Sequence, residues 1–149
     1  MISFAAPLFS DAEKAFNASL TADLEDAGHS VFLPQRDGAA AHKHPYSSMT
    51  PDDRRPAASE LDRDRITACD VFLFVLDGRA PDEGVCVELG SAYGHRFAAQ
   101  FKRLVSGLHT DCRAAFPGSK LDPMLLGAFD VIVEDRRGLL ETVEGGAPQ

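Results

Sequence analysis

The feature that most constrains the fold is a run of six consecutive apolar residues, 71–76, between two aspartates. A run of this length is typical of a strand covered on both faces, as in a parallel sheet flanked by helices. Asp77 and Gly78 then end the strand, and Asp82 can cap the helix that follows. Ligands of open α/β sheets bind beyond the carboxyl ends of strands, so the acids from Asp77 to Glu88 are candidate site residues.

The rest of the chain alternates between apolar stretches typical of strands and segments with the apolar spacing of amphipathic helices. Strands are expected at 2–6, 30–33, 71–76, 101–106 and 129–133, and helices at 10–28, 56–69, 83–97 and 139–143. Ser10 and Glu13 have the spacing of a capping box, and Gly28 is placed to end that first helix. This alternation predicts one domain over residues 1–149, an α/β fold with a doubly wound, flavodoxin-like sheet of five parallel strands ordered 2-1-3-4-5.

Residues 34–56 lack either periodicity and gather Gly, Pro, Ser, His and charged residues. A loop this long inside a compact domain usually serves a function, and we interpret it as a substrate-covering loop. His42 and His44 lie within it, but no third ligand has a fixed spacing from them. We therefore expect solvated histidines and no metal site.

Composition narrows the range of partners. The formal net charge of -8 disfavours a nucleic acid polymer, and small or neutral ligands fit better. No apolar run approaches the ~20 residues of a membrane span, and no signal peptide is apparent, so no membrane partner is expected. Three cysteines without CxxC spacing favour a reducing cytoplasm, with Cys86 as a packing thiol.

Glu88 is unusual because it lies among apolar residues early in the predicted helix. Two adjacent carboxylates can carry out a retaining glycosyl transfer, one as the nucleophile and one handling the proton of the leaving group. The positive end of the helix would favour the ionised form that a nucleophile needs. The alternative from the pattern alone is an ordinary solvated glutamate. Metal hydrolysis also uses clustered acids, but no phosphate-binding loop is visible, and residues 5–10 contain no glycine.

Five segments, in the same order along the chain, resemble the nucleoside 2-deoxyribosyltransferases. They are 6–17, 28–38, 82–90 (Asp-Glu-Gly-Val-Cys-Val-Glu-Leu-Gly), 110–113 and 122–124. The resemblance implies an enzyme that moves the 2-deoxyribosyl group of a 2'-deoxynucleoside to another free nucleobase, with net retention, through a covalent intermediate. It also implies no cofactor and a homo-oligomer whose sites are shared between subunits.

The resemblance assigns three catalytic residues. It makes Glu88 the nucleophile, and it makes Asp82 the residue that binds the sugar 5'-hydroxyl and orients the nucleophile. Asp62 matches a family aspartate in an Asp-x-x-x-Ile pattern and is a candidate to protonate the leaving base or to hold the sugar. Asp64 is a rival for that role.

Substrate contacts are implied elsewhere in the chain. Gln35 and Asp37 match a segment that contacts the base, and Asp77 ends the central strand beside the proposed site. The family takes an Asn from the neighbouring subunit, just before a Met-containing turn. Here that position is Asp122, followed by Met124.

Two other functions stay open. The related 2'-deoxynucleoside 5'-phosphate N-glycosidase is a hydrolase with a similar Glu-Leu-Gly helix, but Asp82 would repel its phosphorylated donor. A non-catalytic nucleotide-binding module on the same fold is the other possibility. Residues 34–38 resemble a subgroup that leans towards purines, while the choice between purine and pyrimidine stays open.

Overall fold

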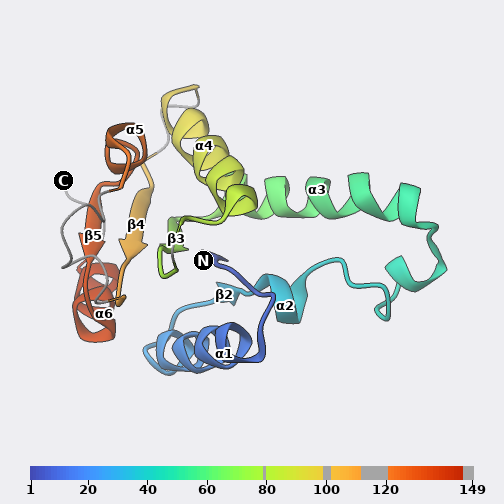
Figure 1. Cartoon of the computed structure of the whole chain (residues 1–149), viewed down its shortest axis with the longest axis horizontal. Helices are drawn as coiled ribbons and strands as arrows, with labels where there is room; N and C mark the ends of the chain where they lie inside the picture. Colours follow the sequence, from blue (N-terminus) through green and yellow to red (C-terminus); the bar gives the residue numbers. More distant parts are fainter. Residues whose placement is uncertain (79, 99–101, 112–120, 146–149) are drawn as a thin grey trace.

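The computed structural model describes residues 1–78, 80–98, 102–111 and 121–145, and its centre is a sheet of five parallel strands (Figure 1). The strands are β1 (Ile2–Ala5), β2 (Val31–Phe32), β3 (Val71–Val75), β4 (Leu104–Leu108) and β5 (Val131–Val133). Their order is β2-β1-β3-β4-β5, and every neighbouring pair is parallel. The doubly wound α/β fold and its predicted strand order are therefore confirmed.

Helices cover both faces of this sheet. They are α1 (Asp11–Asp26), α2 (Pro34–Asp37), α3 (Pro51–Ala68), α4 (Glu83–Ala98), α5 (Pro123–Leu126) and α6 (Arg136–Glu144), with a 3-10 turn, η1 (Tyr46–Ser48). Buried side chains of α1 and α6 pack on one face, and those of α3 and α4 pack on the other. The chain therefore has two hydrophobic cores, one on each side of the sheet.

The central strand β3 separates these cores. Phe72 and Phe74 point into the core under α3 and α4, whereas Leu73 and Val75 point into the core under α1 and α6. None of the four is more than 3% exposed, because β3 lies between β1 and β4 and is covered on both faces. This is the burial expected of an uninterrupted apolar run in a parallel sheet.

Helix α1 begins and ends as its sequence predicts. The Ser10 hydroxyl accepts a hydrogen bond from the Glu13 amide at 3.2 Å, and the Glu13 carboxylate accepts one from the Ser10 amide at 2.7 Å. At the other end Gly28 has a φ of +90°, and the His29 amide donates to the Leu24 carbonyl at 3.1 Å. These contacts satisfy backbone groups that a bare helix end leaves unpaired.

The segment 34–56 is more ordered than predicted. It contains α2 and η1, and α3 begins at Pro51, five residues before the predicted start. Thr50 caps α3 by accepting a hydrogen bond from the Asp53 amide at 3.2 Å. Pro51 fits the first turn because an amide there has no partner within the helix, whereas Pro56 lies inside α3 and removes one backbone bond.

Several other predicted boundaries differ by one to three residues, and β5 begins at Val131 rather than at residue 129. Strand β4 begins at Leu104 rather than at residue 101, which itself lies outside the described residues. Helix α6 begins at Arg136, three residues before its first predicted position, because Asp135 caps it by accepting from the Gly138 amide at 2.7 Å.

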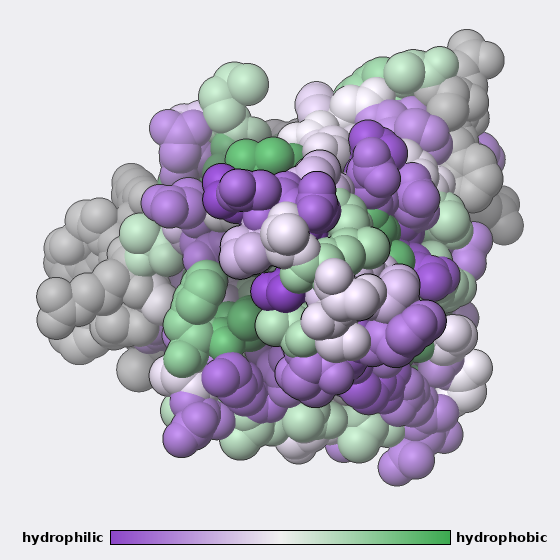
Figure 2. Space-filling view, turned by 90° about the vertical axis from the view of Figure 1, so that its right-hand side faces the viewer, coloured by the Kyte–Doolittle hydropathy of each residue, from purple (hydrophilic) through white to green (hydrophobic). Residues whose placement is uncertain are grey.

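The surface agrees with the acidic, polar composition. Figure 2 looks at the molecule from the side towards which α3 projects in Figure 1, and most of that face is hydrophilic. Within the described residues, no helix combines the length and the apolar character needed to cross a bilayer.

Candidate functional site

Helices α3 and α4 pack against each other on one face of the sheet, and a cavity of about 470 Å³ opens between them. Each helix contributes four lining residues at spacings i, i+3, i+4 and i+7, which place them on a single helical face. The lining residues are Ser59, Asp62, Arg63 and Ile66 from α3, and Gly84, Val87, Glu88 and Ser91 from α4. This cavity therefore brings together Asp62 and Glu88, which the sequence predicts to be catalytic.

The third predicted catalytic acid, Asp82, lies at the start of α4. Its Oδ1 accepts a hydrogen bond from the Val85 amide at 2.9 Å, so the carboxylate caps the helix. A Cβ atom on Gly84 would lie 3.2 Å from the same oxygen. A side chain at position 84 would therefore crowd the carboxylate as well as the cavity.

Glu88 has the most perturbed carboxyl group near the cavity. Burial raises its pKa from 4.5 to about 7, and the charges of Asp62 and Asp82 act in the same direction. The prediction that the start of the helix would favour the ionised form is therefore wrong in its net direction. Loss of solvent and two neighbouring carboxylates outweigh the field of the helix end. The Glu88 carboxyl group therefore keeps its proton to a higher pH than an ordinary glutamate does.

The two rival aspartates, Asp62 and Asp64, face different environments. Burial raises the pKa of Asp62, which is half-buried in the cavity wall. Asp64 is exposed and pairs with Arg63 at 3.8 Å. Of these rivals, the structure brings Asp62 to Glu88 and leaves Asp64 in solvent.

A buried guanidinium fixes the end of α3 near α4. Arg103 is 2% exposed and donates hydrogen bonds to the carbonyls of Ile66 at 2.5 Å and Thr67 at 2.8 Å. The same guanidinium also contacts His95 Nδ1 on α4, at 3.2 Å. Arg103 thus satisfies carbonyls at the end of the helix that carries Asp62 and contacts the helix that carries Glu88.

Gln35 lies on α2, and its amide is engaged with α1. Its Nε2 donates to the Lys14 carbonyl at 2.8 Å, and its Oε1 accepts from Asn17 Nδ2 at 3.3 Å. Gln35 does not line the acid cavity, and its role in base contact stays a prediction.

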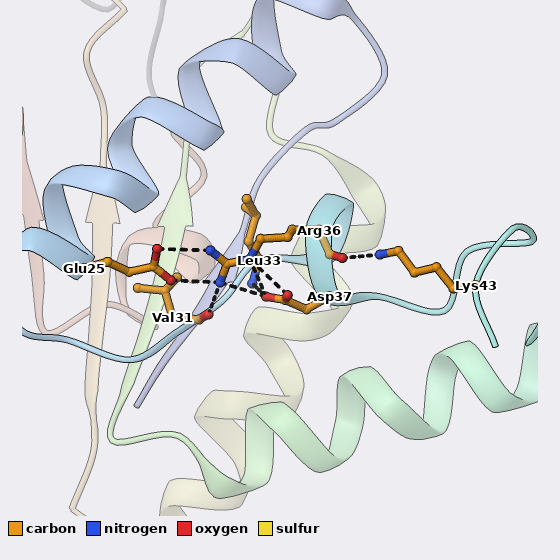
Figure 3. A network of polar contacts seen from close by, with 6 residues as sticks. All are labelled: Glu25, Val31, Leu33, Arg36, Asp37 and Lys43. Atoms are coloured by element: carbon orange, nitrogen blue, oxygen red, sulfur yellow. Dashed lines mark hydrogen bonds and ion pairs between the residues drawn. The ribbon is translucent and has the colours of Figure 1, made fainter. Parts of the chain in front are cut away.

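Asp37 belongs to the polar network of Figure 3. Its carboxylate accepts from the Leu33 amide at 2.9 Å and from the Arg36 guanidinium, which also binds Glu25 and the Val31 carbonyl. Burial would raise the pKa of Asp37, but the bonds from Arg36 and Leu33 lower it on balance. The carboxylate therefore holds α2 against β2 in this structure, and its contact with a base also stays a prediction.

The segment 38–50 contacts α2 and the first turn of α3. Lys43 donates to the Arg36 carbonyl, as Figure 3 shows, and the Arg54 guanidinium binds the carbonyls of Tyr46 and Met49. The cavity lining contains no residue of this segment. The interpretation as a substrate-covering loop gains no support from these contacts.

Asp77 joins the loops that follow β3 and β4. Its carboxylate accepts from the Thr110 amide at 2.6 Å, the Thr110 hydroxyl at 2.5 Å and the Asp111 amide at 3.0 Å. In return, Asp111 accepts from the Gly78 amide at 3.2 Å. These bonds engage both oxygens of Asp77 within the protein, and the side chain does not line the acid cavity.

Asp122 and Met124 lie on the other flank of α4. Asp122 caps α5 by accepting from the Met124 amide at 2.8 Å. Met124 is 83% exposed and lines a second cavity of about 360 Å³, whose α4 wall is Cys86, Leu89, Gly90 and Tyr93. Burial and the charge of Asp82 raise the pKa of the Cys86 thiol, which fits a packing role. Within one chain, α4 therefore separates this pair from the acid cavity.

No group of three His, Cys, Asp or Glu side chains in the described parts of the chain is arranged to hold a metal ion. His42 and His44 are both exposed on the segment before η1. The lining residues that sequence analysis missed are Ser59, Arg63, Gly84, Val87 and Ser91. Helical spacing around Asp62 and Glu88 was the signal that could have found them.

The arrangement of these carboxyl groups suits acid–base chemistry on an uncharged ligand. Three carboxyl groups near one another cannot all ionise at equal cost, so one of them retains a proton to higher pH. An ionised carboxylate beside a protonated one provides a nucleophile and a proton donor in one cavity.

Known proteins share the overall fold of this chain. Among solved structures, a conserved protein from Enterococcus faecalis is 24% identical, with a TM-score of 0.74 over 97% of this chain and 96% of that one. A 2-deoxyribosyltransferase from Bacillus psychrosaccharolyticus is 19% identical, with a TM-score of 0.75 over 95% and 90%. The CMP N-glycosidase BcmB of Clostridium botulinum is 20% identical, with a TM-score of 0.55 over 97% and 98%.

These likenesses concern the fold, and the comparison with curated proteins finds no match. The family model of the nucleoside 2-deoxyribosyltransferases, however, matches residues 2–139, which is nearly the whole chain. That match includes all three acids around the cavity. The chain therefore belongs to the nucleoside 2-deoxyribosyltransferase family, whose chemistry is deoxyribosyl transfer or the related N-glycoside cleavage.

Proposed function

We propose that this protein transfers the 2-deoxyribosyl group of a 2'-deoxynucleoside to a second nucleobase, with retention, through a covalent intermediate on Glu88. The observation that carries the proposal is the half-buried Glu88 carboxyl group. It shares a cavity with Asp62, and the negative charge of Asp82 raises its pKa. The family match over residues 2–139 supports it.

In the first step, a Glu88 oxygen attacks the anomeric carbon while the bond from that carbon to the base nitrogen breaks. The electron pair of that bond leaves with the base, which takes a proton from Asp62. In the second step, a nitrogen of the incoming base attacks from the face that the first base left, its proton passes to Asp62, and Glu88 is released. Two displacements at one carbon give net retention.

The pKa shifts indicate a proton shared between Asp62 and Glu88, and the proposed roles require the state in which Asp62 carries it. Burial raises the pKa of Asp62, and burial together with two acids raises that of Glu88, so the group holds a proton near neutral pH. When the proton lies on Asp62, Glu88 is ionised and can attack. Asp82, fixed as the cap of α4, is assigned to the sugar 5'-hydroxyl.

We also propose that the enzyme is a homo-oligomer in which Asp122 and Met124 serve a neighbouring subunit. Both lie across α4 from the acid cavity of their own chain, and Met124 is 83% exposed. A second copy could bring these side chains to the open side of the cavity.

The test is to trap the sugar on the enzyme. A 2'-deoxy-2'-fluoro donor with a good leaving base slows both steps, because fluorine destabilises their oxocarbenium-like transition states. Intact mass should show one added sugar, and peptide mapping should place it on Glu88. Glu88→Ala should show neither adduct nor base exchange, whereas Glu60→Ala, an exposed change on α3, should show both.

Several results would contradict the proposal. An adduct on Asp62 or Asp82 would overturn the nucleophile assignment, and inverted product would exclude double displacement. Faster reaction with 2'-deoxynucleoside 5'-phosphates, with water as the acceptor, would establish the N-glycosidase reaction instead. We expect slow reaction with such donors, because a dianion would meet the carboxylate of Asp82.

A further inference from the structure

Arg63 is a cationic side chain at an otherwise acidic cavity. It lines the cavity together with Asp62 and Glu88, and its side chain is 62% exposed. In the described part of the chain, its ion pair is with Asp64 at 3.8 Å, a long and exposed contact. Exposed pairs of this kind contribute little to stability, so folding alone does not explain a guanidinium at this place.

The exposure of Arg63 places it at the rim of the cavity. Asp62, the preceding residue, is half-buried in the same wall beside Glu88. A nucleoside whose anomeric carbon meets Glu88 and whose base meets Asp62 would therefore extend its outer edge towards Arg63. The ligand group at Arg63 is then part of the base and not of the sugar.

Guanidinium chemistry limits which base edge fits. The planar fork offers parallel N–H donors and no acceptor, so it binds best to two neighbouring acceptor atoms. Guanine and the related 6-oxopurine hypoxanthine present O6 and N7 as such a pair, whereas adenine presents N7 beside an amino group that is itself a donor.

Charge argues against a phosphate at this position. Asp62, Asp82 and Glu88 act on the same small region, and one exposed guanidinium does not offset them for a dianion. A neutral base with two acceptors gains hydrogen bonds from Arg63 without bringing negative charge to the acids.

We propose that Arg63 selects 6-oxopurines by donating two hydrogen bonds to O6 and N7 of the base, an inference that rests on the proposed transferase function. The preferred substrates are then 2'-deoxyinosine and 2'-deoxyguanosine as donors, and hypoxanthine and guanine as acceptors. Adenine and its nucleoside react less well because their amino group faces a donor.

The test compares Arg63→Gln and Arg63→Lys with the wild-type protein, using kcat/KM for 2'-deoxyinosine and 2'-deoxyadenosine as donors. Arg55→Gln is the matched control, because Arg55 lies on the same helix, is exposed and pairs with Asp52 at 2.7 Å. For Arg63→Gln we expect a loss of about tenfold or more with 2'-deoxyinosine and a change within about threefold with 2'-deoxyadenosine. Lysine should restore little, since it is a point charge without the fork. Arg55→Gln should leave the ratio of the two donors unchanged.

Equal losses with both donors would overturn the inference, because they would indicate a structural role. A loss confined to 5'-phosphorylated donors would also overturn it and would assign Arg63 to phosphate. If the wild-type protein exchanges no base at all, the transferase proposal fails, but calorimetric binding of hypoxanthine and adenine still tests Arg63. A hypoxanthine preference that Arg63→Gln abolishes would support the inference, and equal binding of the two bases to the wild-type protein would refute it.

Discussion

Replacing Glu88 with glutamine should stabilise the protein at high pH. The folded-state pKa of Glu88 is about 7, above its ordinary value of 4.5, because the side chain is buried near two other carboxylates. A raised pKa means that the folded protein binds this proton more tightly than the unfolded chain does. The contribution of Glu88 to stability is therefore present below pH 4.5 and is lost as the pH rises through about 7.

The size of this change in stability follows from the difference between the folded-state pKa of Glu88 and its ordinary value. Each pH unit between the two pKa values corresponds to about 1.4 kcal/mol, which gives a ceiling of about 3 kcal/mol at pH 8. Glutamine has nearly the same shape and never ionises, so it removes both the cost of burying the charge and the repulsion from Asp62 and Asp82. We expect Glu88→Gln to exceed the wild-type free energy of unfolding by about 2 kcal/mol at pH 8, relative to the difference at pH 4.5.

Urea denaturation at pH 4.5, 6, 7 and 8 would measure this difference. Glu60→Gln, on the exposed side of α3, is the control and should stay within about 0.5 kcal/mol of the wild-type protein throughout. A difference between Glu88→Gln and the wild-type protein that does not change with pH would refute the reasoning. If Glu88→Gln instead loses stability relative to the wild-type protein as the pH rises, the predicted direction of the effect is wrong.

Three further predictions concern other parts of the site. Asp82→Asn should lower the rate of base exchange by about 10²-fold or more. Its circular dichroism spectrum should stay unchanged, since asparagine also caps helices. A folded variant with normal exchange would show that Asp82 takes no part in the mechanism. Mixed Glu88→Ala and Asp122→Ala subunits should recover activity that neither parent has, and failure despite proven subunit exchange would place Asp122 outside the neighbour's site. Arg103→Met should cost about 3 kcal/mol in urea denaturation, because carbonyls at the end of α3 lose a charged donor, and a loss below about 1 kcal/mol would contradict that role.

Features determined by local sequence were predictable. The strand at 71–76 and the capping box of Ser10 and Glu13 depend on neighbouring residues, and both are present in the structure. The strand order follows from the alternation of strands and helices, which permits few topologies. The start of α3 differs from the prediction because a proline usually marks a helix boundary, whereas this well-capped helix of 18 residues tolerates Pro56 in its interior.

Features that depend on packing between distant segments were not predictable. The direction of the Glu88 pKa shift depends on how α3 covers α4, and the helix field considered alone has the opposite effect. Arg103 has no local signature, since the carbonyls to which it donates precede it by 36 and 37 residues. Arg63 has no local signature of a site either, because its place in the cavity lining depends on how α3 packs against α4.

The three acids around the cavity belong to one uninterrupted stretch, residues 62–88, which forms the end of α3, strand β3 and the start of α4. Bringing them together closes a short loop of chain, and the entropy cost of doing so does not depend on the outer strands. Strands β2 and β5 lie at the two edges of the sheet, away from this stretch. Changes in the edge strands and their connections can therefore leave the relative placement of Asp62, Asp82 and Glu88 intact.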